Sequence, residues 1–386
     1  MKSLSSKSSA EIHKSNTLSY SPFSSDFPQG EMDRPSRKKP MFKVNEQLRG
    51  FLKEHGREVQ LPVTYRDLKQ FTYALPVKDK DGKDSQWETV IYDMREWDYI
   101  RDGLVRIYAL LKTEGDMSFI KHLDVARVDF CGFGNSQPFR IRIVNKFNDN
   151  YDHYYIKIAD ASRIYGLELE HMLSPNRITF LTDHHTLVEE HIPGIPGDIF
   201  INRFLTQEDT NLIRIAKEFV KFNERCFVRL LGDMRSYNFV VDITPDIYDF
   251  QYRFRAIDFD QQSYEGRKSL YLPQFFKENN QLVSNTLRHL NKDSIEQYQT
   301  EERTMMTFRL VAARYRLKEL LDIMGRDCIS TPEKNQQLAR ELSELHHGNK
   351  SLLKCQNMGQ LVKQHLKVCL RKNLLLVPRI KSRFGD

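Results

Sequence analysis

Two short phrases of the sequence place acidic and amide side chains at the ends of apolar runs. Asp233 and Asn238 lie in the phrase LLGDMRSYNFVVD, and Asp258 lies in the phrase RFRAIDFD. Oxygen ligands of this kind suit Mg²⁺ rather than zinc. Phosphoryl transfer requires a carboxylate that orients the attacking hydroxyl, and an amide and a second carboxylate that hold Mg²⁺ on nucleotide phosphates. The spacing therefore predicts Asp233 as the catalytic residue and Asn238 and Asp258 as metal ligands.

The runs beside these residues favour β-strands. Residues 239–241 and 254–257 are mostly aromatic or β-branched, so the polar side chains would lie at strand ends rather than along solvated faces. Asp and Asn are also common turn residues, so either phrase alone is weak evidence. Asp260 completes an Asp-Phe-Asp phrase and is a further candidate metal ligand, for a second ion.

The chain upstream of these phrases predicts a strand-rich region. Alternating and β-branched residues indicate an antiparallel meander, then a helix that Asp160 is placed to cap, then two more strands. The predicted strands are 125–130, 139–146, 154–158, 178–182 and 187–191, and the predicted helix is 160–173. Before them, apolar residues at helical spacing predict a helix over 95–112, and Asp81-Gly82 suits a tight hairpin.

With the elements in this order, the chain resembles the protein-kinase-like superfamily, and most closely its aminoglycoside and choline phosphotransferase branch. The resemblance implies an α+β, two-lobed fold with a small antiparallel-sheet lobe, a mainly helical large lobe and an N-terminal extension. The predicted segments are a disordered basic, Ser- and Pro-rich tail (1–40), a helical N-terminal extension (41–118), a small lobe (119–192), a large lobe (193–330) and a helical C-terminal extension (331–386).

The resemblance also implies roles for residues of the small lobe. Lys157 would contact the α- and β-phosphates of ATP, with a glutamate of the following helix as its partner, either Glu168, which we favour, or Glu170. Gly132 and Gly134 would let backbone N–H groups approach phosphate oxygens. Glu190 and His191 would bind adenine through their backbone groups.

Departures from the family affect the predicted acceptor. Leu231 and Gly232 stand where protein kinases have His-Arg, Asp260 replaces the glycine of Asp-Phe-Gly, and no Ala-Pro-Glu follows. A histidine common before Gly-Asp in aminoglycoside kinases is also absent. We therefore expect transfer of the γ-phosphoryl group from ATP, with Mg²⁺, to the hydroxyl group of a small molecule. A protein acceptor is the second choice. The alternative is a pseudokinase that binds nucleotide or serves as a scaffold.

Composition narrows the setting of this function. The net charge of +7 favours acidic ligands such as nucleotides, but no aromatic-basic motif supports nucleic-acid binding. Five scattered cysteines without C-x-x-C indicate a reducing compartment, and we expect a cytoplasmic protein without a transmembrane segment. The basic cluster at 34–39 is interpreted as a solvated charge run.

The rest of the chain is predicted to be mainly helical. Apolar spacing indicates helices at 207–226 and 331–345 and one long amphipathic helix across 306–324. The adjacent pairs His184-His185 and His346-His347 lack zinc-ligand geometry, because neighbouring side chains point in different directions. The basic, leucine-rich run at 371–383 is interpreted as a packed helix with a solvated edge.

Overall fold

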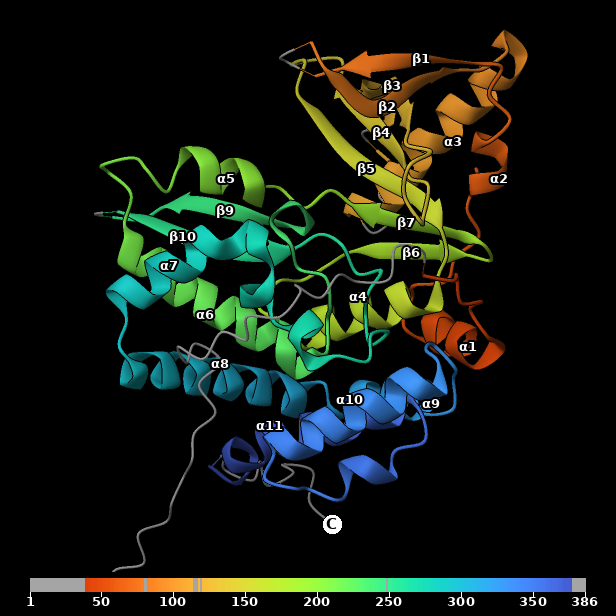
Figure 1. Cartoon of the computed structure of the whole chain (residues 1–386). Helices are drawn as coiled ribbons and strands as arrows, with labels where there is room; N and C mark the ends of the chain where they lie inside the picture. The colour runs from red at the N-terminus through yellow and green to blue at the C-terminus, as the bar shows by residue number, and fades with distance from the viewer. Residues whose placement is uncertain (1–38, 80–81, 114–116, 119, 248, 377–386) are drawn as a thin grey trace, which may run out of the picture.

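The protein combines one large antiparallel sheet with a mostly helical remainder (Figure 1). The computed structural model describes residues 39–79, 82–113, 117–118, 120–247 and 249–376. Most of the predicted tail (1–40) and the end of the basic run at 371–383 lie outside these residues. Within them, no helix is both long enough and apolar enough to cross a membrane.

Seven strands form the large sheet in the order β1-β2-β3-β4-β5-β7-β6, and every neighbouring pair is antiparallel. Alternation explains its amphipathic character, because Phe139, Ile141 and Ile143 of β4 are buried while Arg140 and Arg142 face the other side. The strands are β1 (Tyr73–Lys78), β2 (Asp84–Ile91), β3 (Leu123–Phe130), β4 (Phe139–Asn145), β5 (Tyr151–Ile158), β6 (Phe180–Asp183) and β7 (Thr186–Glu190).

The segment 41–118 is not only helical, in contrast to the prediction. It holds α1 (Glu46–Glu54), α2 (Tyr65–Leu68) and the expected helix, α3 (Met94–Thr113), but also the hairpin β1-β2. The hairpin extends the large sheet, because Glu88 of β2 pairs with Phe130 of β3. Except for Val90, the side chains of its strands are exposed or only partly buried, so burial imposes little apolar alternation on β1 and β2.

α3 covers one face of the large sheet and closes a hydrophobic cluster there. Its buried side chains Leu104 and Ile107 join Ile141 of β4 and Ile156 of β5 in that cluster. The opposite face of β5 carries Lys157, since successive side chains of a strand alternate. The apolar back of the sheet therefore leaves its polar face for the candidate site.

Helix α4 (Ala161–Leu173) lies between the sheet and the helical part (Figure 1). Asp160 caps it as predicted, because its side chain accepts a hydrogen bond from Arg163 N. The same carboxylate accepts from Phe42 N (2.6 Å) and from Lys39 Nζ (2.6 Å). Lys39 is therefore buried, and the interpretation of the basic cluster as solvated is wrong for this residue.

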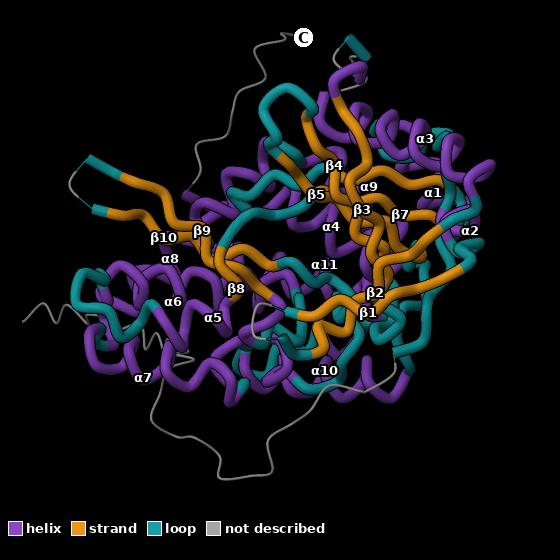
Figure 2. The backbone as a smooth tube through the Cα atoms, turned by 90° about the horizontal axis from the view of Figure 1, so that it is seen from above, coloured by secondary structure: helices purple, strands orange, loops and turns teal. Residues whose placement is uncertain are grey.

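A second, three-stranded sheet in the order β10-β9-β8 lies apart from the large one (Figure 2). Helix α6 ends directly before the turn that leads into β9. The elements of this region are β8 (Ile195–Pro196), α5 (Gly197–Arg203), α6 (Leu212–Arg229), β9 (Phe239–Pro245), β10 (Phe250–Ala256) and α7 (Asn280–His289).

The last third of the described chain is helical. The predicted helix across 306–324 is interrupted at Ala313, which ends one helix and precedes the next. Thr331 caps the following helix as predicted, and α11 packs against the earlier helices α6, α8, α9 and α10. These helices are α8 (Lys292–Ala312), α9 (Arg314–Met324), α10 (Pro332–Leu345) and α11 (Met358–Leu376).

Candidate functional site

The turn between α6 and β9 holds Asp233 in a fixed backbone conformation. Leu230 ends α6 in the left-handed region (φ 55°), and Asp233 adopts it again (φ 58°). Backbone hydrogen bonds support this conformation, since Asp233 N donates to Leu270 O (3.0 Å). Gly232 fits because a Cβ there would lie only 3.1 Å from Gln261 O. The turn is thus built from groups on several segments.

Asn238 and Asp258 lie at the same end of the pair β9-β10. Phe239 pairs with Ala256, and Ile257 N donates to Asn238 O (3.0 Å), so Ile257 lies opposite Asn238 and Asp258 is the next residue along the chain. The Asn238 side chain is bound to the turn as well, because its Nδ2 donates to Asp233 O (2.7 Å). The structure therefore brings the three residues of the two sequence phrases together.

Asp233 titrates in an unusual range. Burial is the main cause that raises the pKa of its carboxyl to about 7; Arg235 Nε, at 2.8 Å from Asp233 Oδ1, opposes the shift, and the nearby Asp258 charge adds to it. A carboxyl whose pKa lies near 7 can exchange a proton at neutral pH. Asp233 thus has the charge behaviour of a group that receives or orients a hydroxyl proton.

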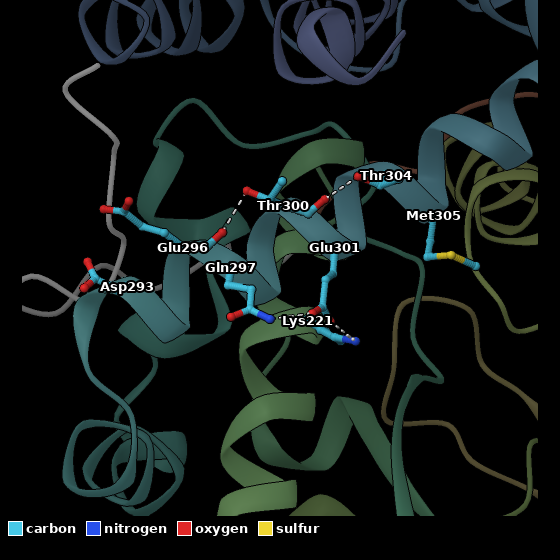
Figure 3. A pocket seen from close by; sticks show the side chains of 8 residues that line it. All are labelled: Lys221, Asp293, Glu296, Gln297, Thr300, Glu301, Thr304 and Met305. Carbon is cyan, nitrogen blue, oxygen red and sulfur yellow. Dashed lines mark hydrogen bonds and ion pairs between the residues drawn. The ribbon is translucent and has the colours of Figure 1, made fainter. Parts of the chain in front are cut away.

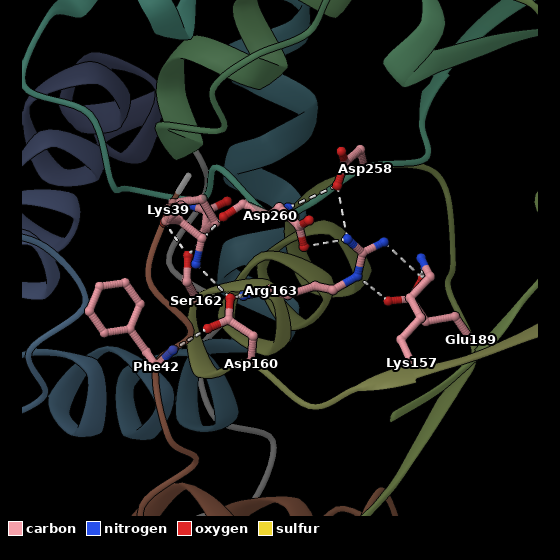
Figure 4. A network of polar contacts seen from close by, with 10 residues as sticks. Lys39, Phe42, Lys157, Asp160, Ser162, Arg163, Glu189, Asp258 and Asp260 are labelled. Carbon is pink, nitrogen blue, oxygen red and sulfur yellow. Dashed lines mark hydrogen bonds and ion pairs between the residues drawn. The ribbon is translucent and has the colours of Figure 1, made fainter. Parts of the chain in front are cut away.

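Lys157 joins the site from β5, as predicted, but its partner is different. Its Nζ donates to Glu189 Oε2 (2.7 Å), and Glu189 belongs to β7, where it lies opposite Tyr155 (Figure 4). Cross-strand neighbours share one face of a sheet. The carboxylate that holds Lys157 therefore comes from the sheet and not from α4.

The predicted pairing of Lys157 with Glu168 is wrong. Glu168 is fully buried and accepts from Arg316 Nη2 (2.7 Å) and Arg57 Nε (3.3 Å). Its alternative, Glu170, contacts Arg229 instead. Side chains of α4 point in different directions around the helix axis. Glu168 is five positions beyond Arg163 and therefore points about 140° away from the direction of Arg163.

Arg163 is the residue that the sequence prediction missed. Its buried guanidinium donates from Nη1 to Asp258 Oδ1 (2.8 Å) and Asp260 Oδ1 (2.6 Å), and from Nη2 to Glu189 Oε2 (3.0 Å) (Figure 4). One cation therefore joins β7 to the segment that follows β10. A signal was present, since an arginine in the first turn of a helix opposes the helix dipole and needs anionic partners.

The charges of this network act on one another. Burial disfavours the charged form of Glu189, yet Arg163 and Lys157 lower the pKa of its carboxyl to about 2. Burial lowers the pKa of Lys157, and the Arg163 charge lowers it further. Burial raises the pKa of Asp258, as does the Asp260 charge, although the Asp258 side chain is 35% exposed. The Asp258 carboxyl is thus more exposed to solvent than those of Asp260 and Glu189.

The donor set fits Mg²⁺ in chemical type. Asn238 lies at the start of β9, Asp258 and Asp260 follow the end of its partner strand β10, and all three offer hard oxygen atoms. Arg163 uses one oxygen of each of the two carboxylates and leaves the second oxygen of each for another cation. A divalent ion bound here would therefore share its ligands with a guanidinium.

Gly132 and Gly134 lie in the exposed loop between β3 and β4. A Cβ at Gly134 would meet no atom within 4 Å, and the intervening Phe133 is 76% exposed. The loop contacts the strand that carries the lysine, because Ile158 N donates to Ser136 O (3.3 Å). The loop is therefore beside Lys157, and its binding of phosphate stays a prediction.

The side chains of Glu190 and His191 serve the fold. Glu190 accepts from Thr179 N (2.7 Å), and His191 Nδ1 lies 3.4 Å from Tyr155 Oη. Neither contact tests whether their backbone groups bind adenine.

A separate hollow of about 710 Å³ lies on the surface of α6 and α8 (Figure 3). It contains none of the predicted site residues, and Lys221 forms an ion pair with Glu301 across it (3.0 Å). The hollow is lined by Lys221, Asp293, Glu296, Gln297, Thr300, Glu301, Thr304 and Met305. The hollow is therefore separate from the candidate site.

The fold and site together define an α+β protein with a polar network between a seven-stranded sheet and a turn that follows α6. No protein-family model matches the chain. No curated protein matches it either. Among solved structures, it is similar to titin kinase and its flanking domains, with a TM-score of 0.25 and 13% identity over 62% of this chain. The chain covers 53% of that structure, and a similarity at this level supports no conclusion about fold or activity.

Proposed function

We propose that this protein is an ATP- and Mg²⁺-dependent phosphotransferase with a two-lobed, protein-kinase-like fold, closest to the aminoglycoside and choline phosphotransferase branch. The observation that carries the proposal is the hydrogen bond from Ile257 N to Asn238 O (3.0 Å). It holds the two sequence phrases together, with Asn238 at the start of β9 and Asp258 just beyond the end of β10, directly after the turn that carries Asp233. We infer that their amide and carboxylate groups converge with Asp233 as phosphoryl transfer requires.

Each residue has a role that follows from the chemistry of its side chain. Asp233, whose pKa is raised to about 7 by burial, orients the acceptor hydroxyl and accepts its proton. Lys157, held by Glu189, contacts the nucleotide phosphates. Asn238 and Asp258 would hold Mg²⁺, with Asp260 as a further ligand, and the ion would supply charge neutralisation to the phosphates.

The acceptor in this proposal is a small molecule that carries a hydroxyl group, and a protein acceptor is the second choice. A small acceptor agrees with the absence of an Ala-Pro-Glu segment after Asp260 in the sequence. We place the reaction in the cytoplasm, because the cysteines of the described chain are free thiols.

A second candidate function is a pseudokinase that binds nucleotide without transferring phosphate. One observation favours it: Arg163 Nη1 donates hydrogen bonds to Oδ1 of both Asp258 and Asp260. A guanidinium in this place repels a divalent ion and already neutralises much of the carboxylate charge. The pseudokinase would use its helical segments to bind partners.

Binding and turnover of Mg²⁺-ATP distinguish these functions. The affinity for Mg²⁺-ATP and the transfer of labelled γ-phosphate to a panel of polyols, sugars, aminoglycosides and test proteins are measured for wild type and Asp258→Asn. The phosphotransferase predicts transfer that falls by about 100-fold or more in the variant.

Asp242→Asn is the matched control, because Asp242 lies on β9 opposite Arg253 and away from the turn. It should leave both quantities unchanged. Binding without transfer to any acceptor supports the pseudokinase. If wild type binds no nucleotide with or without Mg²⁺, both proposals fail.

A further inference from the structure

Two histidines and a cysteine gather in the helical part, away from the candidate site. His346 ends α10, and His365 and Cys369 lie four residues apart on α11. Residues at this spacing share one face of a helix. His365 and Cys369 are buried, and His346 is partly buried. The neighbouring His347 is exposed and does not belong to this cluster.

The distances within the cluster agree with a tetrahedral ion. Bonds of about 2.0–2.1 Å from zinc to nitrogen and about 2.3 Å to sulfur place tetrahedral ligand atoms about 3.3 Å apart for two nitrogens and about 3.6 Å for nitrogen and sulfur. His346 Nε2 lies 3.4 Å from His365 Nδ1. Cys369 Sγ lies 3.7 Å from His365 Nδ1 and 3.9 Å from His346 Nε2.

A backbone carbonyl orients the central histidine. His365 Nε2 lies 3.2 Å from Phe227 O, an acceptor that selects the tautomer with the proton on Nε2. Nδ1 then keeps its lone pair for the other two side chains. Metal-binding histidines commonly donate their second N–H to a carbonyl in this way.

Hydrogen bonding alone explains the cluster poorly. A separation of 3.4 Å between two imidazole nitrogens is longer than an ordinary hydrogen bond. Sγ of Cys369 also lies 3.5 Å from His365 Nε2, so the thiol rests beside the ring and directs itself at neither nitrogen.

The surrounding charges permit a cation. Arg303 is the nearby positive group, and its Nε donates to Glu224 Oε1 (2.5 Å), so its charge is balanced. A coordinating ion would release the thiol proton of Cys369 to solvent.

We propose that His346 Nε2, His365 Nδ1 and Cys369 Sγ bind a zinc-class divalent ion, with water as the fourth ligand. Two imidazoles and a thiolate favour zinc over Mg²⁺ or Ca²⁺. The ion joins the end of α10 to α11, and His365 connects it to Phe227 near the end of α6. The ion would thereby tie the last helices to the helix that precedes the turn of Asp233. This site does not depend on the proposed phosphotransferase activity.

Cobalt provides a direct test on the full-length protein. After dialysis against a chelator, the protein is titrated with Zn²⁺ and with Co²⁺, and metal content is measured by mass spectrometry. We expect one ion per chain, tetrahedral d–d bands of Co²⁺ and a thiolate-to-cobalt charge-transfer band. Zn²⁺ should displace Co²⁺ and raise the Tm.

Variants assign the ligands. His346→Gln and Cys369→Ser should each weaken Zn²⁺ binding by at least about 100-fold, and Cys369→Ser should also remove the charge-transfer band. The matched controls are His347→Gln and Cys328→Ser, which change exposed residues of the same types. A wild-type protein that binds neither ion overturns the proposal, with no need for a folded variant. So does binding that both ligand variants retain in full.

Discussion

Single residues in the site hold charges that burial alone would not permit. Glu189 stays ionised because Arg163 and Lys157 both contact it, whereas Arg235 offsets the burial of Asp233 only in part. The two carboxyls therefore have pKa values on opposite sides of the ordinary range. Such a separation indicates which acid holds position and which can exchange a proton.

The raised pKa of Asp233 predicts a pH-dependent stability. The folded protein binds more protons than the unfolded chain between the ordinary value of 3.8 and about 7, so stability falls as the pH rises through that window. Asp233→Asn removes this loss. As the pH rises from about 4 to about 8, the free energy of unfolding of the variant should increase relative to that of wild type by about 2 to 4 kcal/mol.

Urea denaturation at a series of pH values measures this gain. Asp242→Asn is the control, and its curve should run parallel to that of wild type. A constant difference between Asp233→Asn and wild type across the whole range would show that Asp233 titrates normally.

Removal of the Arg163 charge should expose its effect on the carboxylates. Arg163→Met leaves Glu189, Asp258 and Asp260 with less compensation, so we expect a loss of about 3–5 kcal/mol in stability. Mg²⁺ should then restore more stability to the variant than it adds to wild type, because the same oxygens become free. Thermal unfolding with and without Mg²⁺ measures both effects.

Arg229→Met is the matched control, since Arg229 is equally buried and contacts Glu170 away from this network. It should lose similar stability without a gain from Mg²⁺. Equal responses of the two variants to Mg²⁺ would contradict a cation site at Asp258 and Asp260.

At the scale of elements, the sequence predicted those whose burial leaves a pattern. The strands from β3 to β7 and the helices α3 and α4 have regular apolar spacing or a capping residue such as Asp160. The strands β1 and β2 have side chains that are exposed or only partly buried, except Val90, and leave no such pattern, so the sequence indicated only the turn between them, at Asp81-Gly82. Local pattern also predicted Asp233, Asn238 and Asp258, because each lies beside a strand-like run.

The partner of Lys157 depends on tertiary structure and was not predictable in this way. Glu189 reaches Lys157 only because β7 pairs with β5 in one register. Glu168 turns away because α4 packs its far side against α8 and α9. Spacing along a helix gave its direction relative to other residues of α4, but not relative to the sheet.

This difference predicts separate effects for two glutamates. Glu168→Gln should lower the free energy of unfolding by about 3 kcal/mol, because Arg316 and Arg57 lose a buried charge, and should leave Mg²⁺-ATP affinity unchanged. Glu189→Gln should also destabilise the protein, and in addition weaken nucleotide binding, since Lys157 loses the group that holds it. Calorimetric titration with Mg²⁺-ATP measures the distinction. A loss of affinity in Glu168→Gln alone would support the original pairing.

At the scale of the whole molecule, the C-terminal helices share a core with the helix that leads to the site. Leu342 of α10 and Leu366 and Leu370 of α11 belong to the same hydrophobic cluster as Phe219 of α6. Each buried leucine contributes about 1.5–3 kcal/mol, so these helices are a substantial part of the fold. The segment after residue 330 therefore supports the position of α6 and, through it, the turn of Asp233.

The close approach of α11 to α9 provides the test of this dependence. A Cβ at Gly359 would lie 2.0 Å from Met324 O, so Gly359→Ala forces α11 away from the end of α9. Overpacking of this kind costs about 1–3 kcal/mol, and we expect a lower Tm with a single cooperative transition, because the helices share one core. Gly50→Ala in α1 is the control, since a Cβ there meets no atom within 4 Å and alanine favours a helix. If Gly359→Ala melts in two steps, with the α11 region unfolding first, the C-terminal helices form a separate unit and do not position the site.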